Sequence, residues 1–555
     1  MYQVTLMRTK RSLPLNRVNH KGVDTEAPIR QVLATSRCET QGIDPVFMRG
    51  ANVRTRPNRA ICLTAPEPPR EGGRAARPGS TRSYAAHAVR TLRPAGLTGG
   101  AMVRRAYTQR SLVEVLLPDA DKLWDPTLRR IDALLDDEVL VDRIADALAR
   151  RHPQSRRRGR LGTPAAVVLR LLVLKHLYDW SFDECEREVR GHLVYRAFCR
   201  IDGERVPDAK TLIRLAPLLD EAVLKDVLTR LVMLGRTQGL IRGRRLRVDT
   251  TVVETNIHYP TDSTLLADGV RVLTRTVRRL GAPVRERARS IARRVFEIAQ
   301  RSRTTGGRTS PALRERTRAR MKFLYQGLLR ITRGVVRDAE TVVRHLTARP
   351  RPRVQPLVAR LQATLAVVRQ VLAQTRARVL RGDTHYPHKV VSVFEPHTEI
   401  LRKGKLAKPT EFGRLVKIQE AEAQFITDYH VCERGVADRA LWVPALDRHI
   451  ALFARPPRLA VADGGFASPT NEHAARARGV RHVVLPRHPR ATRSRAARAA
   501  LRWRTGSEGR ISALKRCHGL RRCRYRGATG MQRWVGLGAI ANNLKILGRA
   551  GPCAA

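Results

Sequence analysis

Two aspartates in this chain lie where a strand could hold a reactive carboxylate. Asp249 interrupts the β-branched run "LRVDTTVV" (246–253), although aspartate is depleted in strands. Asp463 ends the apolar run "LAVAD" and precedes two glycines. A side chain at the carboxyl end of a buried parallel strand points into the crevice where α/β proteins bind ligands. Both carboxylates are therefore candidates for chemistry rather than for packing.

Carboxylate oxygens suit a hard divalent cation, because Mg²⁺ accepts a few protein oxygens and keeps several waters. Two such ions, about 4 Å apart, would clamp the attacking and leaving oxygens of an in-line phosphoryl displacement. Asp249 and Asp463 therefore favour metal-dependent phosphoryl transfer. A third acidic ligand would be expected beside them.

The third carboxylate is ambiguous from local features. Glu508 lies in "LRWRTGSEGRISALKRCHGL", where a helix is expected to open near Thr505 to Ser507, with Arg504 one turn before Glu508 and Lys515 seven residues after it. The pattern Thr505-x-x-Glu508 is also a capping box, which would make Glu508 structural. A competing candidate is Glu472, in "TNEHAA".

The composition indicates the partner of such a site. The 555 residues include 107 basic and 49 acidic ones, for a formal net charge of +58. A charge of this size predicts binding to a polyanion, with nucleic acid favoured over an anionic membrane surface. Nearly all the basic residues are arginine, which suits bidentate phosphate contacts, although a GC-rich genome produces the same bias. Only 5% of the residues are aromatic, which argues against a base-stacking RNA-binding protein.

The cysteines and the apolar runs indicate the compartment. None of the eight cysteines forms a CxxC pair, which is typical of free thiols in a reducing environment. The longest apolar run (164–178) is too short to span a membrane, and the N-terminus has no signal-peptide pattern. We expect a cytoplasmic protein that acts at the nucleoid and has no membrane partner.

The catalytic residues need a sheet to position them, and strand patterns occur on both sides of Asp463. Runs at 388–396 and 423–431 are expected to pair as strands, and short buried strands are expected at 458–466 and 481–486. Amphipathic helices are expected between them, for example at 437–454. The predicted fold class is α/β, with a mixed sheet flanked by helices.

Two helical regions surround this core. Residues 105–240 show helical periodicity and predict an all-helical N-terminal domain with basic loops. Residues 271–381 hold 29 basic and 5 acidic residues in long helical patterns. Such a segment is either a solvated charged face or, as the imbalance favours, a clamp on the DNA backbone.

Residues 1–104 lack sustained periodicity. They are either a disordered DNA-tethering arm or an extension that arises from a start codon placed too early, with true translation beginning near Met102.

Several long blocks together resemble the DDE transposases of bacterial insertion sequences, which have an RNase H-like core. "VDTTVVETNIHYPTDSTLL" is similar to the first-aspartate block of one branch of these enzymes, and "VADGGFAS" is similar to the second. "TPAAVVLRLLVLKHLYDWSFDECEREVR" and "RVPDAKTL" resemble that branch's helical N-terminal domain, and "GLRRCRYRGATGMQRWVGLGAIANNL" resembles its C-terminal end. The family signature Tyr-x2-Arg-x3-Glu-x6-Lys is matched by Arg504, Glu508 and Lys515, with Leu501 in place of the tyrosine.

The resemblance implies a site and a set of partners. Asp249, Asp463 and Glu508 would be the catalytic and metal-binding triad for two Mg²⁺ or Mn²⁺ ions. Arg504 and Lys515 would bind DNA near the terminal phosphates of the element. The expected partners are the terminal inverted repeats and the target DNA, and a homodimer is expected in the synaptic complex.

The same resemblance implies a domain plan. Residues 1–104 are the extension, 105–240 the DNA-binding domain, and 241–546 the RNase H-like catalytic domain with a basic helical insertion at about 265–383. A tail follows at 547–555.

The expected activity is metal-dependent end cleavage followed by strand transfer. Two alternatives stay open. One is a two-metal nuclease without strand transfer, and the other is a decayed copy that only binds DNA.

Overall fold

The structure is a computed structural model in which the chain forms two compact units, residues 1–92 and 93–555. All the residues that it describes lie in the second unit. They are 104–105, 120–152, 154, 162–201, 203–283, 288–304, 310–348, 350–402, 409–486 and 494–550. The predicted N-terminal extension therefore lies outside the described residues, apart from Arg104. Among the helices described, none is long and apolar enough to cross a membrane.

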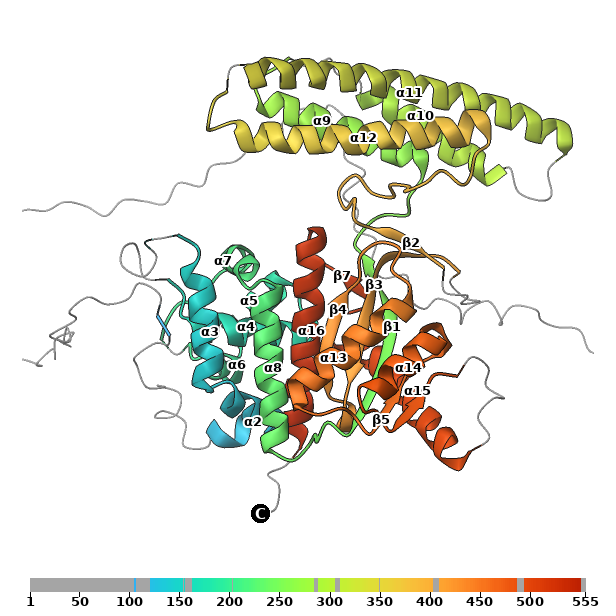
Figure 1. Ribbon diagram of the computed structural model, residues 1–555. Coiled ribbons are helices and arrows are strands. Elements are labelled where there is room, and N and C mark those ends of the chain that lie inside the picture. Colours follow the sequence, from blue (N-terminus) through green and yellow to red (C-terminus); the bar gives the residue numbers. More distant parts are fainter. Residues whose placement is uncertain are drawn as a thin grey trace, which may run out of the picture. The chain divides into compact units, whose positions relative to one another are not determined.

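Seven α-helices form the N-terminal part of the described chain (Figure 1). The helix α4 is buried on all sides, as its apolar sequence predicts. Most of the others begin at an aspartate or serine whose side chain accepts a backbone N–H, which satisfies a donor left free by the helix start. Their bounds are α2 (Pro126–Leu134), α3 (Glu138–Ala149), α4 (Ala165–Leu177), α5 (Phe182–Gly191), α6 (Leu193–Phe198), α7 (Ala209–Leu215) and α8 (Glu221–Thr237).

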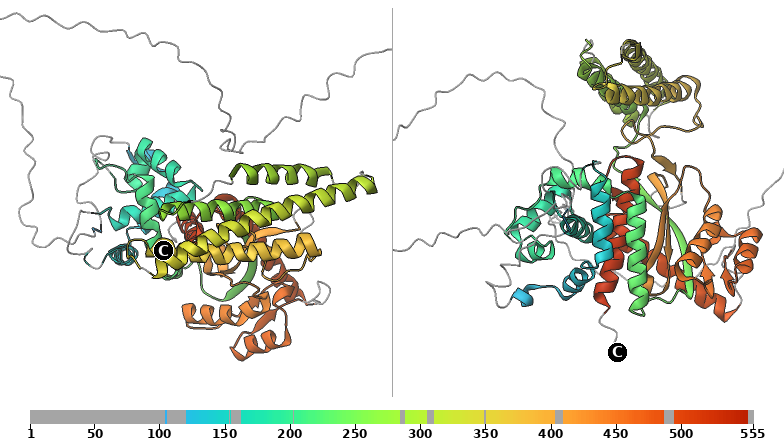
Figure 2. Two further views of the ribbon diagram at one scale, coloured as in Figure 1. Left: turned by 90° about the horizontal axis from the view of Figure 1, so that it is seen from above. Right: turned by 60° about the vertical axis from the view of Figure 1, so that its left-hand side comes forward.

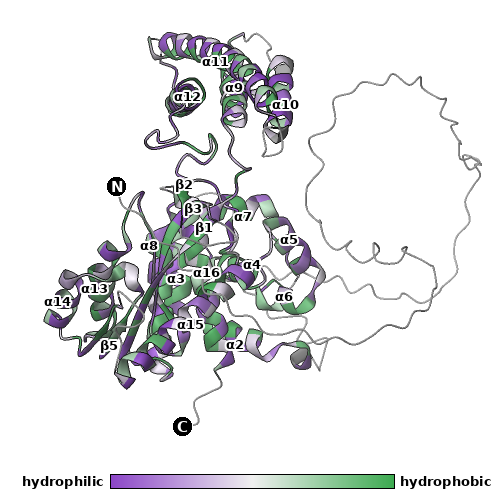
Figure 3. Ribbon diagram, turned by 90° about the vertical axis from the view of Figure 1, so that its right-hand side faces the viewer, coloured by the Kyte–Doolittle hydropathy of each residue, from purple (hydrophilic) through white to green (hydrophobic). Residues whose placement is uncertain are grey.

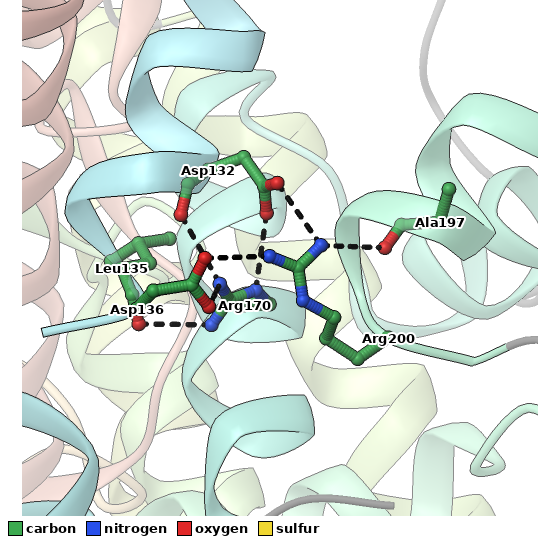
Figure 4. Close-up of polar contacts among 6 residues, drawn as sticks. All are labelled: Asp132, Leu135, Asp136, Arg170, Ala197 and Arg200. Carbon is green, nitrogen blue, oxygen red and sulfur yellow. Dashed lines mark hydrogen bonds and ion pairs between the residues drawn. The ribbon is translucent and has the colours of Figure 1, made fainter. Parts of the chain in front are cut away.

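A buried arginine ties these helices together (Figure 4). Arg170 of α4 has a side chain that is 1% exposed, and it pairs with Asp132 at 3.3 Å and with Asp136 at 2.7 Å. Arg200, which follows α6, pairs with the same two aspartates at 3.0 and 2.7 Å. A buried guanidinium is tolerated when its donors are satisfied, and Arg170 also donates to the Leu135 carbonyl. The network fixes the end of α2 against α4.

A mixed sheet follows, with its central strands in the order β4-β3-β1-β5-β6. The strand β3 is antiparallel to β1 and β4, whereas β5 and β6 run parallel to β1. This arrangement confirms the predicted α/β class with an RNase H-like sheet. The strands are β1 (Arg245–Thr255), β2 (Glu399–Leu401), β3 (Glu411–Glu420), β4 (Ile426–Val431), β5 (Leu459–Val461), β6 (His482–Val484) and β7 (Arg522–Cys523).

Two layers of helices cover the sheet. The even-numbered side chains Leu246 and Val248 of β1 pack in one apolar core with α13 (Trp442–Phe453) and α14 (Pro469–Ala477). On the opposite face, the strands contact α15 (Arg495–Cys517) and α16 (Gly527–Arg549). The N-terminal helices share the core of α16, and α8 runs beside α16 in Figure 2.

Small residues let α16 occupy this central position. It packs against α2, α4, α8 and β4, and most of its length is buried. A Cβ atom on Gly536 would overlap the buried Tyr429 phenol, and one on Gly548 would lie 2.8 Å from the Thr127 carbonyl oxygen. Glycine at these positions therefore sets how closely the N-terminal helices and the sheet approach α16.

Four further helices interrupt the sheet between β1 and β2. They are α9 (Asp262–Arg279), α10 (Ala288–Thr304), α11 (Pro311–Ala348) and α12 (Gln355–Arg381). Their apolar side chains form a core of their own, which includes Leu273, Leu328 and Val368. The insertion is thus a helical unit that buries its own hydrophobic faces.

Two predicted elements are wrong. Residues 388–396 form no strand; Val390 and Val393 instead pack on the helical insertion, and Gln374 exchanges two hydrogen bonds with the Val390 backbone. The partner of β4 is β3, not the 388–396 segment. The alternating pattern there was real, but the surface that it covers belongs to helices.

The close approach at Gly536 can be tested against Gly509, a glycine in α15 whose Cβ would meet nothing within 4 Å. We expect Gly536→Ala to lower the free energy of unfolding by about 1–3 kcal/mol through overpacking. We expect Gly509→Ala to raise it by up to about 1 kcal/mol through helix propensity. Chemical denaturation of both variants measures the difference. Equal stabilisation by both would contradict the packing of α16 described above.

Candidate active site

Asp249 lies in the middle of β1, at the point where the neighbouring strand ends. On one edge it pairs with Ile418 of β3. On the other edge β5 pairs only with residues 245–247, and its chain then turns away towards Asp463. The two aspartates predicted from sequence therefore converge at the carboxyl end of β5. Their electrostatic interaction is one cause of the raised pKa of Asp463.

The Asp249 carboxylate is held by three groups. Its Oδ2 accepts a hydrogen bond of 2.6 Å from the Ser507 hydroxyl of α15. Its Oδ1 accepts the backbone N–H of Thr250 at 2.8 Å. The Arg504 guanidinium lies 3.9 Å from Oδ2. With its side chain 12% exposed, Asp249 is oriented by its neighbours but still reaches solvent.

A second side chain of β1 explains why α15 lies here. Arg247 is two residues from Asp249 and therefore faces the same side of the strand. It donates to the Trp503 carbonyl at 2.7 Å and pairs with Glu420 of β3 at 2.5 Å. A Cβ atom on Gly506 would lie 2.7 Å from its Nη1, so a glycine lets the helix approach. Residues 503–507 thus form one helical turn that docks on Arg247 and Asp249.

Asp463 begins a short 3-10 helix, η5 (Gly464–Phe466), and its Oδ1 accepts the Gly465 N–H at 3.0 Å. Burial raises the pKa of Asp463, and the carboxylates of Asp249 and Asp438 raise it further. Arg504 opposes this rise. The site is therefore short of positive charge near Asp463.

Asp438 is an acidic neighbour that the sequence did not single out. It begins the 3-10 helix η4 (Asp438–Leu441), and its Oδ1 accepts a hydrogen bond of 3.1 Å from the Thr250 hydroxyl. A Cβ atom placed on Gly465 would lie 3.0 Å from Asp438 Oδ2 and 3.2 Å from Asp463 Oδ1. No local pattern around Asp438 could have indicated this, because only the fold brings η4 beside η5.

Glu508 lies on α15 with its side chain 65% exposed, and its Oε1 is 3.5 Å from Arg504 Nη2. The capping-box interpretation is wrong, because α15 begins at Arg495 with Ser494 as its N-cap. Thr505 lies in the helix interior, where its hydroxyl donates to the Leu501 carbonyl. Glu508 is therefore free of a capping role.

The remaining predicted residues lie on the flanking helices. Lys515 follows Glu508 on α15, two turns further along. Glu472 lies on α14 and pairs with Arg476 at 3.6 Å.

The structure joins the three predicted carboxylates unequally. Asp249 and Asp463 interact directly, whereas Glu508 is linked to Asp249 through the Arg504 guanidinium. Among the described residues, no group of three or more His, Cys, Asp or Glu is arranged to hold a metal ion. The donor chemistry nevertheless fits a hard divalent cation, since carboxylate oxygens converge and their mutual repulsion raises the pKa of Asp463.

Two segments of the chain match known families. Residues 114–216 match the model described as "Transposase domain (DUF772)", and residues 473–547 match "Transposase DDE domain". The first match covers most of the N-terminal helices. The second runs from α14 into α16 and includes Arg504, Glu508 and Lys515.

One curated protein is also similar. It is the "Uncharacterized protein ORF8 in nfe locus" of Rhizobium meliloti, 27% identical over 149 residues, which are 26% of this chain and 72% of that protein. No solved structure matches the chain.

The sheet and these matches together define the class, which is a transposase. More particularly, the two matches support a DDE-type transposase of an insertion sequence, which confirms the resemblance seen in the sequence. Transposases of this family generally use divalent metal ions and act on DNA.

The raised pKa of Asp463 predicts a stability effect. A carboxyl group with a raised pKa in the folded state loses stabilising free energy as the pH rises through that value, so its ionised form costs stability at neutral pH. Asp463→Asn keeps the N-cap acceptor and removes the charge. We expect it to raise the melting temperature at neutral pH and to have little effect under acidic conditions, where Asp463 is protonated.

Thermal unfolding across a pH series, without divalent ions, measures this effect. Asp338→Asn is a matched control, because Asp338 lies exposed on α11. A lower melting temperature for Asp463→Asn at neutral pH would contradict the proposed crowding of negative charge.

Proposed function

We propose that this transposase cleaves the DNA ends of an insertion sequence and joins them to target DNA, with Asp249, Asp463 and Glu508 as its catalytic carboxylates. The observation that supports this most directly is the convergence of Asp249 and Asp463 at the end of β5, beside the turn of α15 that carries Arg504, Ser507 and Glu508. That turn belongs to the segment that matches a transposase DDE domain.

Asp249 and Asp463 would hold a divalent cation, with Glu508 as the third ligand, and the bound ion would supply positive charge to the scissile phosphodiester. We propose two such sites, as the resemblance implies, for Mg²⁺ or Mn²⁺. The Ser507 hydroxyl fixes the orientation of Asp249. Asp438 adds negative charge next to Asp463 and so increases the attraction for a cation.

The reaction consists of two in-line displacements at phosphorus. In the first, water attacks the phosphodiester at the end of the element, the P–O3′ bond breaks, and the element is left with a free 3′-hydroxyl. In the second, that hydroxyl attacks a phosphodiester of the target and displaces its 3′-oxygen. Each step exchanges one P–O bond for another, so positioning and charge stabilisation suffice without a covalent enzyme intermediate.

Arg504 has a role that the geometry makes specific. Its guanidinium lies between Asp249 and Glu508, at 3.9 and 3.5 Å from their oxygens. When a cation neutralises these carboxylates, the arginine becomes available to a DNA phosphate, for which its planar donors are suited. Lys515, on the same helix, would bind a terminal phosphate. The absence of the family tyrosine at Leu501 removes a stacking or phosphate contact but leaves the carboxylates unchanged.

The carboxylates can be tested one at a time. We expect Asp249→Ala, Asp463→Ala and Glu508→Gln each to abolish cleavage of the element ends while leaving end binding intact, because the lost groups hold the cation rather than the DNA. A cleavage assay with Mg²⁺ or Mn²⁺ and a gel-shift assay measure the two properties. Glu472→Gln is the control and should retain activity. Full activity of Glu508→Gln would reassign the third ligand, with Glu472 the first alternative.

The orienting hydroxyl gives a separate prediction. Removing a group that orients a metal ligand typically costs about 10- to 100-fold in metal affinity or activity, and we expect Ser507→Ala to slow cleavage by this amount. Thr505→Val is the matched control, since the Thr505 hydroxyl bonds only to the Leu501 carbonyl within its own helix. Higher cation concentrations should partly rescue Ser507→Ala. An unchanged rate would show that Ser507 does not position Asp249.

Strand transfer requires its own assay. A substrate that carries pre-cleaved 3′-hydroxyl ends should be joined to target DNA by the wild-type protein. Cleavage without joining would identify a two-metal nuclease instead. Normal end binding without either reaction would identify an inactive copy that only binds DNA.

A further inference from the structure

The helix α11, with 38 residues, has two contrasting faces. Its buried side chains contact the core of the helical insertion and recur at helical spacing; they include Leu324, Leu328, Thr332, Val335 and Ala339. The opposite face is exposed. In Figure 3 hydrophilic residues recur along this helix. The apolar side of α11 is thus fully used by α9, α10 and α12, which leaves the other side for a different role.

Four arginines form a row on the exposed face. Arg330, Arg333, Arg337 and Arg344 are separated by three, four and seven residues, and all four are exposed. At 3.6 residues per turn these spacings keep them within about 60° of the helix circumference. The row spans about 21 Å, at a rise of 1.5 Å per residue. Arg316 and the exposed Phe323 extend the same face towards the start of α11.

The carboxylates of the insertion are engaged elsewhere. Glu297 pairs with Arg301 and Arg320, and Glu340 pairs with Arg369 of α12. Asp262 pairs with Arg378, also of α12. Within the described residues, none of the four arginines of the row lies within 4 Å of a carboxylate. Four like charges on one face of a helix repel one another, so an anionic partner would stabilise this surface.

We propose that the arginine row of α11 binds the phosphate backbone of duplex DNA, at a contact separate from the catalytic carboxylates. A straight row on a single helix fits a linear array of charges, and duplex DNA presents one phosphate per about 1.7 Å of its axis. Guanidinium groups form paired hydrogen bonds with phosphate oxygens. The contact carries no sequence information, because it reaches only the backbone.

This inference rests on the proposed function only in taking DNA as the partner. It makes the helical insertion a holding surface whose charge does not depend on Asp249 or Asp463. The partner is duplex DNA rather than an acidic protein because the row is regular and because +58 on the whole chain makes a polyanion the matching ligand.

The salt dependence of binding tests the proposal. Each phosphate neutralised contributes about 0.9 to the slope of log K against log salt concentration. We therefore expect the full-length protein with Arg330, Arg333, Arg337 and Arg344 all changed to Gln to lose about three to four units of slope on a random-sequence DNA duplex. Fluorescence anisotropy across a salt series measures the slope, and circular dichroism checks that the variant is folded.

A charge-matched variant controls for the loss of net charge. It replaces four other exposed arginines of the insertion by Gln: Arg275, Arg279, Arg360 and Arg376. We expect it to lose less than about one unit of slope. Equal losses in the two variants would show a diffuse charge effect and would overturn the assignment to α11, as would an unchanged slope in the α11 variant.

The two proposals fail in different ways. Asp249→Ala should keep the full slope on the random duplex, because it leaves the arginine row intact. A wild-type protein that cleaves no element ends but shows the predicted loss of slope in the α11 variant would refute only the proposed catalysis. Normal cleavage with an unaffected slope would refute only the arginine row. Equal binding of duplex RNA through the row would overturn the choice of DNA.

Discussion

The buried ion pair between Arg247 and Glu420 is the interaction on which the candidate site depends. Both side chains are 2% exposed, and removing either partner would leave an uncompensated buried charge, at a typical cost of about 3–5 kcal/mol. Arg247 also binds the Trp503 carbonyl and lies against Gly506, so it sets where α15 crosses β1. That register places Ser507 on Asp249 and Arg504 between Asp249 and Glu508. The chemistry is therefore positioned by a side chain that takes no part in it.

The separate apolar cores give the fold its second organising constraint. The core around α16 contains the N-terminal helices and one face of the sheet, whereas α13 and α14 cover the other face with a core of their own. The helical insertion has a third core. Asp249 and Asp463 lie 214 residues apart in the sequence. They can still meet, because the long interval is largely filled by a unit that buries its own hydrophobic surface and leaves the pairing of β1 with β5 undisturbed.

Periodicity predicted those elements whose surroundings are simple. The uniform apolar pattern of α4, the alternation in β1 and the short strand before Asp463 were all readable, because burial on one or all sides imposes its own spacing. The prediction failed at 388–396, where Val390 and Val393 alternate as in a strand but pack on helices. It also placed the start of α15 about ten residues too late, since Thr505 and Ser507 resemble capping residues although both lie inside the helix.

The sequence by itself determined the fold class, the two strand-borne aspartates and the basic character of the chain, because strand alternation and charge are local properties that survive without knowledge of contacts. Only the tertiary structure decided which groups share the site. Asp438 enters it through the approach of η4 to η5, and Arg504 links Glu508 to Asp249 because Arg247 fixes one turn of α15. Such neighbours come from segments far apart in the chain. Their meeting follows from packing, and no spacing in the sequence records it.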